Sequence, residues 1–89
     1  MFKNLYSIYD KKSQTYAQPM AEVNDGTAQR IIMDLMHQNP THPFNRYPED
    51  YELVRIGRFN ELDGNIDLGG DEIMSVVAQL ETIRQALGE

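Results

Sequence analysis

The sequence predicts an α+β fold, a single small domain of β-α-β-β-α order whose small mixed or antiparallel sheet carries two amphipathic helices on one face. Three observations predict it: two segments rich in aromatic and branched side chains, two segments with apolar residues at helical spacing, and a length of 89 residues. A chain of this length forms one domain and buries only about 60–65% of the surface that its unfolded form exposes. Self-association is a natural way for it to bury more.

The first strand is expected at residues 4–10, where aromatic and branched residues dominate. After a polar excursion over residues 11–18, residues 20–23 add a short extended piece. Asn24 is a good N-cap for a helix that runs to about Gln38, because its side-chain oxygen can accept a free backbone N–H of the first turn. The helix has one apolar stripe, formed by Ala28, Ile31, Ile32, Leu35 and Met36.

Residues 39–50 contain three prolines and are expected to form an irregular connection. The strongest strand follows at residues 51–59, and the Asp63-Gly64 pair then predicts a tight turn into a short antiparallel strand at residues 66–68. A strand, a helix and a second strand often place the two strands parallel, so we expect residues 4–10 and 51–59 to run parallel.

The C-terminal helix is expected over residues 71–87, after a break at Gly69-Gly70. Its acidic first turn suits the helix dipole. Its apolar stripe consists of Ile73, Val76, Val77, Leu80, Ile83 and Leu87. The single domain over residues 1–89 thus divides into a sheet with its first helix, residues 1–68, and an acidic amphipathic helix, residues 69–89.

The charge is distributed unevenly along the chain. Residues 1–58 carry seven basic and seven acidic side chains, whereas residues 59–89 carry one basic and seven acidic side chains, which accounts for the net charge of −6. An acidic chain is a poor general nucleic-acid binder, but its basic and aromatic residues gather in the first two thirds. The chain has no cysteine and no apolar run near the ~20 residues that span a bilayer, so we expect a soluble intracellular protein without membrane contact.

The sequence favours a protein without enzymatic activity, metal or cofactor. It has no glycine-rich phosphate loop and no Ser or Cys nucleophile beside a plausible base. His37 and His42 are separated by five positions across a proline and lack neighbouring cysteines, so they do not predict a zinc site. Residues 59–70 resemble a calcium loop, but Phe59 and Gly70 stand where oxygen ligands are required.

One group of side chains on the 51–59 strand favours single-stranded nucleic acid. Tyr51, Arg55 and Phe59 are expected on one strand face, where rings can stack on bases and a guanidinium group can pair with phosphate. The alternative is that these rings belong to the core, and Leu53 in the middle of the same face supports it. Tyr9 and Tyr16, beside Lys11 and Lys12, would extend the surface.

Several short motifs resemble those of a family of small nonstructural proteins from microviruses, the single-stranded DNA phages, in particular the gokushovirus branch. The motifs extend over about residues 5–66. They are Leu5–Asp10, Lys11-Lys12, Tyr16 with Pro19, Asn24-Asp25 with Arg30, Pro48-Glu49-Asp50, Tyr51–Phe59 and Asp63-Gly64.

The resemblance implies a protein that is absent from the virion, acts in the cytoplasm of the infected bacterium, and binds DNA or aids viral single-stranded DNA synthesis. We therefore expect a non-enzymatic homodimer that binds single-stranded viral DNA or the replication complex. The expected contacts to phosphate are Lys11, Lys12, Arg30, Arg55 and Arg58, and the expected stacking rings are Tyr9, Tyr16, Tyr51 and Phe59. The alternative is an interaction adaptor that binds a phage replication or capsid protein, or a host protein, through Val76, Leu80 and the acidic face, without DNA.

Overall fold

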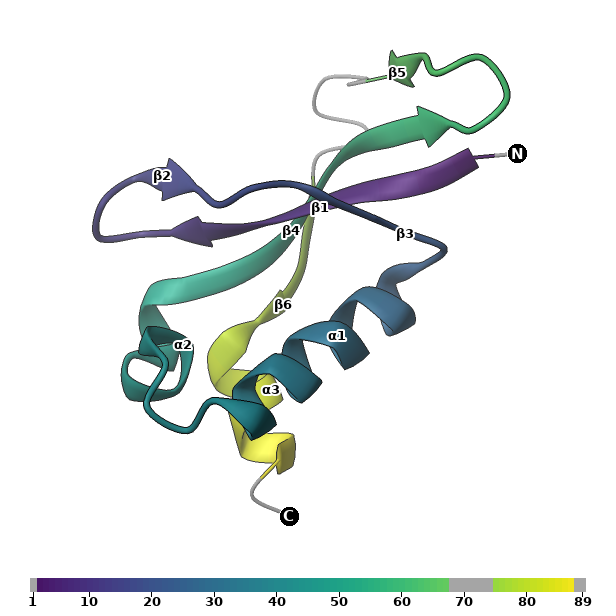
Figure 1. The fold of residues 1–89 in the computed structure, drawn as a ribbon. Helices are drawn as coiled ribbons and strands as arrows, with labels where there is room; N and C mark the ends of the chain where they lie inside the picture. Colours follow the sequence, from purple (N-terminus) through teal and green to yellow (C-terminus); the bar gives the residue numbers. More distant parts are fainter. Residues whose placement is uncertain (1, 68–74, 88–89) are drawn as a thin grey trace.

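A computed structural model describes residues 2–67 and 75–87, and it confirms the α+β fold (Figure 1). The strands form one open sheet in which every pairing is antiparallel. The strands are β1 (Phe2–Asp10), β2 (Thr15–Tyr16), β3 (Met20–Glu22), β4 (Tyr51–Asn60), β5 (Ile66–Asp67) and β6 (Ser75–Gln79). The helices are α1 (Asp25–Gln38), α2 (Pro43–Arg46) and α3 (Leu80–Leu87), with a 3-10 turn, η1, at Pro48–Asp50.

The chain is built from two successive hairpin–helix units. In the first, β1 pairs with β2 and β3 and is followed by α1; in the second, β4 pairs with β5 and β6 and is followed by α3. The units join where β1 pairs with β4 in the middle of the sheet. Both long helices lie on the same face of the sheet (Figure 1).

The expected parallel pairing of residues 4–10 with residues 51–59 is wrong, because β1 and β4 run antiparallel from Phe2 opposite Asn60 to Asp10 opposite Tyr51. The reason is the return strand formed by β2 and β3, which brings the chain back along β1 before α1 begins. Since α1 then crosses the sheet again, β4 starts beside the end of β1 and must run in the opposite direction.

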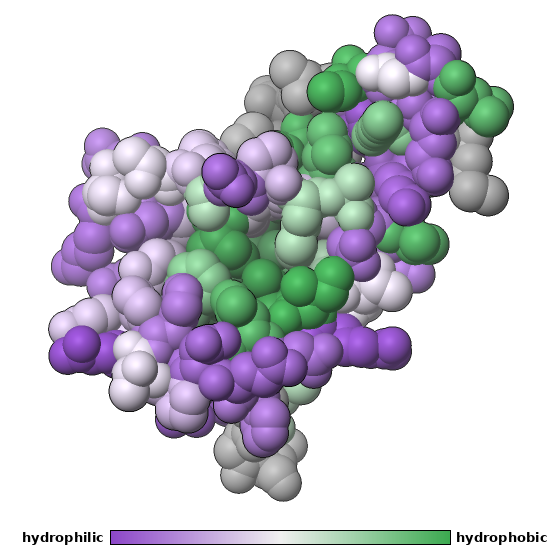
Figure 2. Space-filling view, in the orientation of Figure 1, coloured by the Kyte–Doolittle hydropathy of each residue, from purple (hydrophilic) through white to green (hydrophobic). Residues whose placement is uncertain are grey.

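A small core lies between the sheet and the helices. Its members share exposed fractions below one tenth and come from two strands and two helices: Tyr6, Ile8, Ala28, Ile32, Met36, Leu53, Leu80 and Ile83. Burial of each large aliphatic side chain contributes roughly 1.5–3 kcal/mol, and this burial holds the helices against the sheet. In Figure 2 apolar surface is visible in the seam between sheet and helix layer.

The first helix has the predicted limits. Asn24 is its N-cap, and the side-chain oxygen of Asn24 accepts a 2.9 Å hydrogen bond from the backbone N–H of Thr27. The Thr27 hydroxyl in turn accepts from the backbone N–H of Asn24 at 3.3 Å, which completes a capping box. Ile31, predicted on the apolar stripe, is 40% exposed.

The C-terminal helix is shorter than predicted. Residues 75–79 form strand β6, which pairs with β4, and α3 begins only at Leu80; the predicted start at residues 71–74 and the Gly69-Gly70 break lie outside the described residues. Val76 and Val77 fit the helical spacing, but β-branched residues favour strands and here they extend the sheet. The hairpin from β4 to β5 is as predicted, with Gly64 at φ +78° in its turn.

Candidate nucleic-acid interface

Two of the predicted stacking residues form a cross-strand pair at the end of the first hairpin. Tyr9 of β1 lies opposite Tyr16 of β2, and their ring centroids are 4.7 Å apart with an interplanar angle of 40°. Tyr16 is 49% exposed, whereas Tyr9 is half-buried beneath it. The Tyr16 ring is therefore held in place on one side and open to solvent on the other, which a stacking platform for a base requires.

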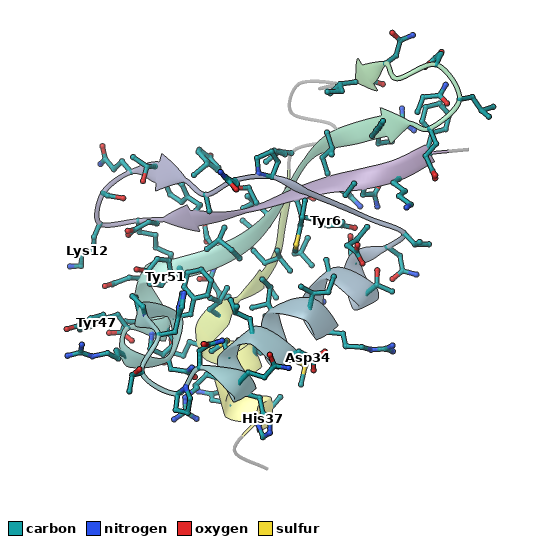
Figure 3. All side chains as sticks on the ribbon, in the orientation of Figure 1. Tyr6, Lys12, Asp34, His37, Tyr47 and Tyr51 are labelled. Atoms are coloured by element: carbon teal, nitrogen blue, oxygen red, sulfur yellow. The ribbon has the colours of Figure 1, made fainter. Side chains whose placement is uncertain are left out.

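The turn that joins β1 to β2 presents a lysine beside this pair. The Asp10 carboxylate accepts hydrogen bonds from the backbone N–H groups of Lys12, at 2.9 Å, and Ser13, at 3.4 Å. Desolvation acts to raise the pKa of Asp10, but these hydrogen bonds outweigh it and lower the pKa, so the carboxylate stays charged and keeps the turn in shape. Lys12 is exposed at the end of the molecule (Figure 3).

Lys11 has a different environment from Lys12. Its ammonium group donates to the backbone oxygen of Glu49 at 3.1 Å and to Gln79 Oε1 at 2.8 Å, and Gln79 Nε2 donates to Glu52 Oε2 at 2.7 Å. Lys11 thus ties the hairpin to the second unit of the fold. Its charge still lies at this end of the sheet, but two of its three N–H donors already have partners.

The two strand arginines predicted to contact phosphate are each placed beside a carboxylate. Arg55 Nη1 lies 3.5 Å from Asp25 Oδ1 and Arg55 Nη2 donates to Ser75 Oγ at 3.3 Å. Arg58 Nη2 donates to Asp67 Oδ2 at 3.1 Å, and its guanidinium carbon lies 5.4 Å from the centroid of the Phe2 ring. The neighbouring carboxylate of each arginine lowers its attraction for phosphate.

A β-bulge separates Phe59 from the other residues of the predicted strand face. Tyr6 pairs with Arg55 but Leu5 pairs with Gly57, so β4 carries an extra residue at this point. Beyond the bulge the alternation is reversed, and Phe59, opposite Lys3, lies on the face away from the helices. The predicted single face of Tyr51, Arg55 and Phe59 is therefore wrong.

Tyr51 is packed rather than open. Its ring makes an edge contact with Phe44, with centroids 4.8 Å apart, and Phe44 itself packs on the core. Desolvation, followed by the negative charges of Asp10 and Asp50, raises the pKa of the Tyr51 hydroxyl. The alternative that this ring belongs to the core describes its surroundings better than a stacking role does.

An arginine–tyrosine pair lies near the hairpin end. It was not among the DNA contacts predicted from the sequence. The guanidinium carbon of Arg46 lies 5.5 Å from the centroid of the Tyr47 ring, and Tyr47 is 47% exposed. Figure 3 shows Tyr47, Tyr51 and Lys12 at the same end of the molecule, and the backbone N–H of Lys11 donates to the Asp50 oxygen at 2.8 Å. The only sequence signal for this pair is the adjacency of Arg46 and Tyr47 within residues 39–50. The prediction that this segment is irregular is wrong over α2 and η1, where Pro43 and Pro48 each begin a short helical turn.

The remaining basic residues lie elsewhere. Arg30 is exposed on α1, in the helix layer. A pocket of about 190 Å³ lies at the C-terminal end of α1 and is lined by Met36, His37, Pro40, Asn45 and Arg84. Neither Arg30 nor this pocket contributes to the hairpin end. We name the hairpin end the tyrosine–lysine end and define it as Tyr9, Lys11, Lys12, Tyr16, Arg46 and Tyr47.

These features define a small α+β domain with an aromatic and basic surface at one end of an antiparallel sheet. Comparison with known protein families matches residues 3–80 to the family described as Phage ORF5 protein, and the chain belongs to this family. No curated protein and no solved structure matches the chain. Within the described residues, no helix is long and apolar enough to cross a membrane.

Proposed function

We propose that this phage protein is a non-enzymatic, nonstructural protein that binds single-stranded DNA during viral genome synthesis in the cytoplasm of the infected bacterium. The observation that carries the proposal is the half-exposed Tyr16 ring, which packs on Tyr9 in the hairpin whose turn carries the exposed Lys12. An exposed ring beside a cation is what a sequence-independent binder of single strands uses, since every base has a flat face and every nucleotide a phosphate.

The arrangement supports a short contact with the strand. Tyr16 would stack on one base and Tyr47 on another, while Lys12 and Arg46 would each neutralise a phosphate. Base stacking contributes roughly 1–3 kcal/mol per base, and each neutralised phosphate contributes about 0.7 to the slope of log affinity against log salt. With two phosphates neutralised, we expect a slope of about −1.4.

The adaptor alternative keeps one of its two expected contact residues. Val76 is 53% exposed on β6, whereas Leu80 is fully buried in the core. A charged residue at Leu80 would therefore unfold the domain and would not test an interface, whereas a charged residue at Val76 does test it. Other exposed apolar side chains that a protein partner can reach, Leu62 and Ile66, lie near the tip of the second hairpin.

The proposal is tested by fluorescence anisotropy of a labelled single-stranded oligonucleotide with three variants. Replacement of Tyr16 by Ala is expected to weaken binding about 5- to 150-fold, the equivalent of one lost stacking contact, while Tyr16→Phe keeps the ring and the affinity. Lys12→Gln is expected to lower the magnitude of the salt slope by about 0.7.

Arg30→Gln is the control for Lys12→Gln, because it removes the same charge from an exposed position on α1, outside the tyrosine–lysine end. Equal effects of the two substitutions would mean that binding follows the net charge alone. An unchanged affinity in Tyr16→Ala would mean that the tyrosine–lysine end does not bind the single strand.

A further inference from the structure

The far end of the sheet forms a projection that the helices do not cover (Figure 1). We name it the β-arm and define it as residues 2–4 of β1, residue 23, and residues 57–67 of β4, β5 and the turn between them. In the arm, Phe59 pairs with both Lys3 and Ile66, which places these three side chains on the sheet face opposite to the helices. The arm reaches past the N-terminal end of α1.

Exposed apolar side chains are concentrated on the β-arm. Within residues 2–67 and 75–87, eight large apolar or aromatic side chains are exposed, and four of them lie on the arm: Leu62 at 84%, Val23 at 64%, Ile66 at 61% and Phe2 at 55%. Figure 2 shows apolar surface on this projection among hydrophilic neighbours. Ile66 lies on the same face as Lys3, whereas Phe2, one position earlier on β1, lies on the other face, so the arm exposes apolar side chains on both faces. Scattered apolar residues are ordinary on a protein surface, but their concentration on one projection makes it a candidate interface.

The charges of the arm are largely cancelled within the arm itself. Lys3 lies 3.9 Å from Glu61, and Arg58 lies 3.1 Å from Asp67. The arm carries two basic side chains, Lys3 and Arg58, and three acidic ones, Glu61, Asp63 and Asp67, so its net charge is −1 against −6 for the whole chain. A second copy can therefore approach the arm with little repulsion.

We propose that the β-arm is the interface of a homodimer in which the arms of two copies pack against each other. A twofold interface uses the same surface of both copies, and an apolar surface whose charges are paired internally can pack against itself. A stable interface buries about 800 Å² on each partner, and this is the area that each arm would have to supply. The dimer leaves the tyrosine–lysine end of each copy free, so this inference holds whether or not the protein binds DNA.

Sedimentation equilibrium of the full chain, from about 1 to 200 µM, tests the proposal. The wild-type protein is expected to be a dimer in the upper part of this range, and Ile66→Lys is expected to weaken association at least tenfold by placing an unpaired charge in the interface. Ile31→Lys is the matched control, because Ile31 is also exposed, at 40%, but lies on α1. Its association should equal that of the wild type.

A second variant keeps the test decisive if Ile66→Lys disturbs β5. Val23 is exposed outside any strand or helix, and Val23→Lys is expected to weaken the dimer while its circular dichroism stays that of the wild type. A wild-type protein that is monomeric at 200 µM overturns the proposal. Dimerisation that Ile31→Lys abolishes and Val23→Lys leaves intact overturns it as well, since the interface would then lie on the helix layer.

Discussion

At the scale of single residues, the Tyr6 hydroxyl connects three parts of the fold. It donates a 2.6 Å hydrogen bond to Asp25 in the first turn of α1 and accepts one of 2.9 Å from Asn4 Nδ2. The same Asp25 oxygen lies 3.5 Å from Arg55 of β4. Because Tyr6 is fully buried, its hydroxyl has no water to replace these partners.

Replacing Tyr6 by Phe removes this hydroxyl and keeps the ring. We expect the free energy of unfolding to fall by about 1–2 kcal/mol, because Asn4 and Asp25 lose a partner in a part-buried site. Urea denaturation measures the change. Tyr16→Phe is the control and should shift the free energy by less than about 0.5 kcal/mol, since the Tyr16 hydroxyl is at the surface. Equal losses in both variants would contradict the assigned network.

The same residue predicts a dependence of stability on alkaline pH. Burial, followed by the hydrogen bond to Asp25, raises the pKa of Tyr6 from 10.0 to about 12. The folded state therefore keeps the Tyr6 proton at a pH where the unfolded state has lost it. As a result, the contribution of the Tyr6 hydroxyl to the free energy of unfolding is complete below pH 10 and disappears as the pH approaches 12. Ultraviolet titration of tyrosinate should show a late step that Tyr6→Phe removes. A Tyr6 that ionises near pH 10 would contradict the burial.

At the scale of elements, the capping box fixes where α1 begins, and α1 supplies three of the buried core residues. Asn24→Ala removes the acceptor for the Thr27 N–H and is expected to cost about 1 kcal/mol of stability. Asn24→Ser keeps a capping oxygen and is expected to cost little. Thermal unfolding followed by circular dichroism compares the two variants; if serine were as damaging as alanine, the cap would not be the cause.

Elements with strong local signals could be predicted from sequence, whereas those that depend on distant partners could not. The limits of α1 follow from Asn24 and the apolar stripe, and the β4–β5 hairpin follows from Asp63-Gly64. The strand β6 was missed because Val76 and Val77 fit a helix as well as a strand, and only pairing with β4 decides between them.

In the candidate site, too, local features could be predicted from the sequence, whereas contacts with distant residues could not. Tyr16 and Lys12 were predicted from local composition, and they lie on the same hairpin, Tyr16 on β2 and Lys12 in the turn before it. The partners of Arg55 and Lys11, namely Asp25 and Gln79, lie 30 and 68 positions away in the chain, so a pattern on one strand could not reveal them. The bulge that turns Phe59 to the other face does have a local signal, because it lies beside Gly57 and an isolated glycine in a strand often marks a bulge. The glycine alone does not fix which strand carries the extra residue, and only the pairing with β1 shows this.

At the scale of the whole molecule, two hairpin–helix units place different surfaces at opposite ends of the sheet. The turn of the first hairpin carries the tyrosine–lysine end, and the turn of the second forms the apolar tip of the β-arm. In a dimer joined through the arms, two tyrosine–lysine ends would be linked in one particle. Simultaneous contact with one strand then raises the apparent affinity through effective concentration, provided that the strand spans both ends.

Oligonucleotide length tests this coupling between association and binding. A strand long enough to reach both ends is expected to bind at least tenfold more tightly than one that covers a single end, and Ile66→Lys should abolish the difference. Anisotropy with a series of increasing lengths measures it, with Ile31→Lys as the control. A length effect that persists in Ile66→Lys would mean that the dimer does not cause it.

Single-stranded DNA binding is tested most directly by titrating a labelled single-stranded oligonucleotide with the wild-type protein. Fluorescence anisotropy follows the binding at two salt concentrations, with duplex DNA as the competitor. We expect saturable binding that duplex displaces poorly and that weakens by about 0.7 log unit per log unit of salt for each phosphate neutralised. Absence of binding at tens of micromolar protein and low salt would contradict it, and the protein's role in the phage would then have to be sought in contacts with other proteins.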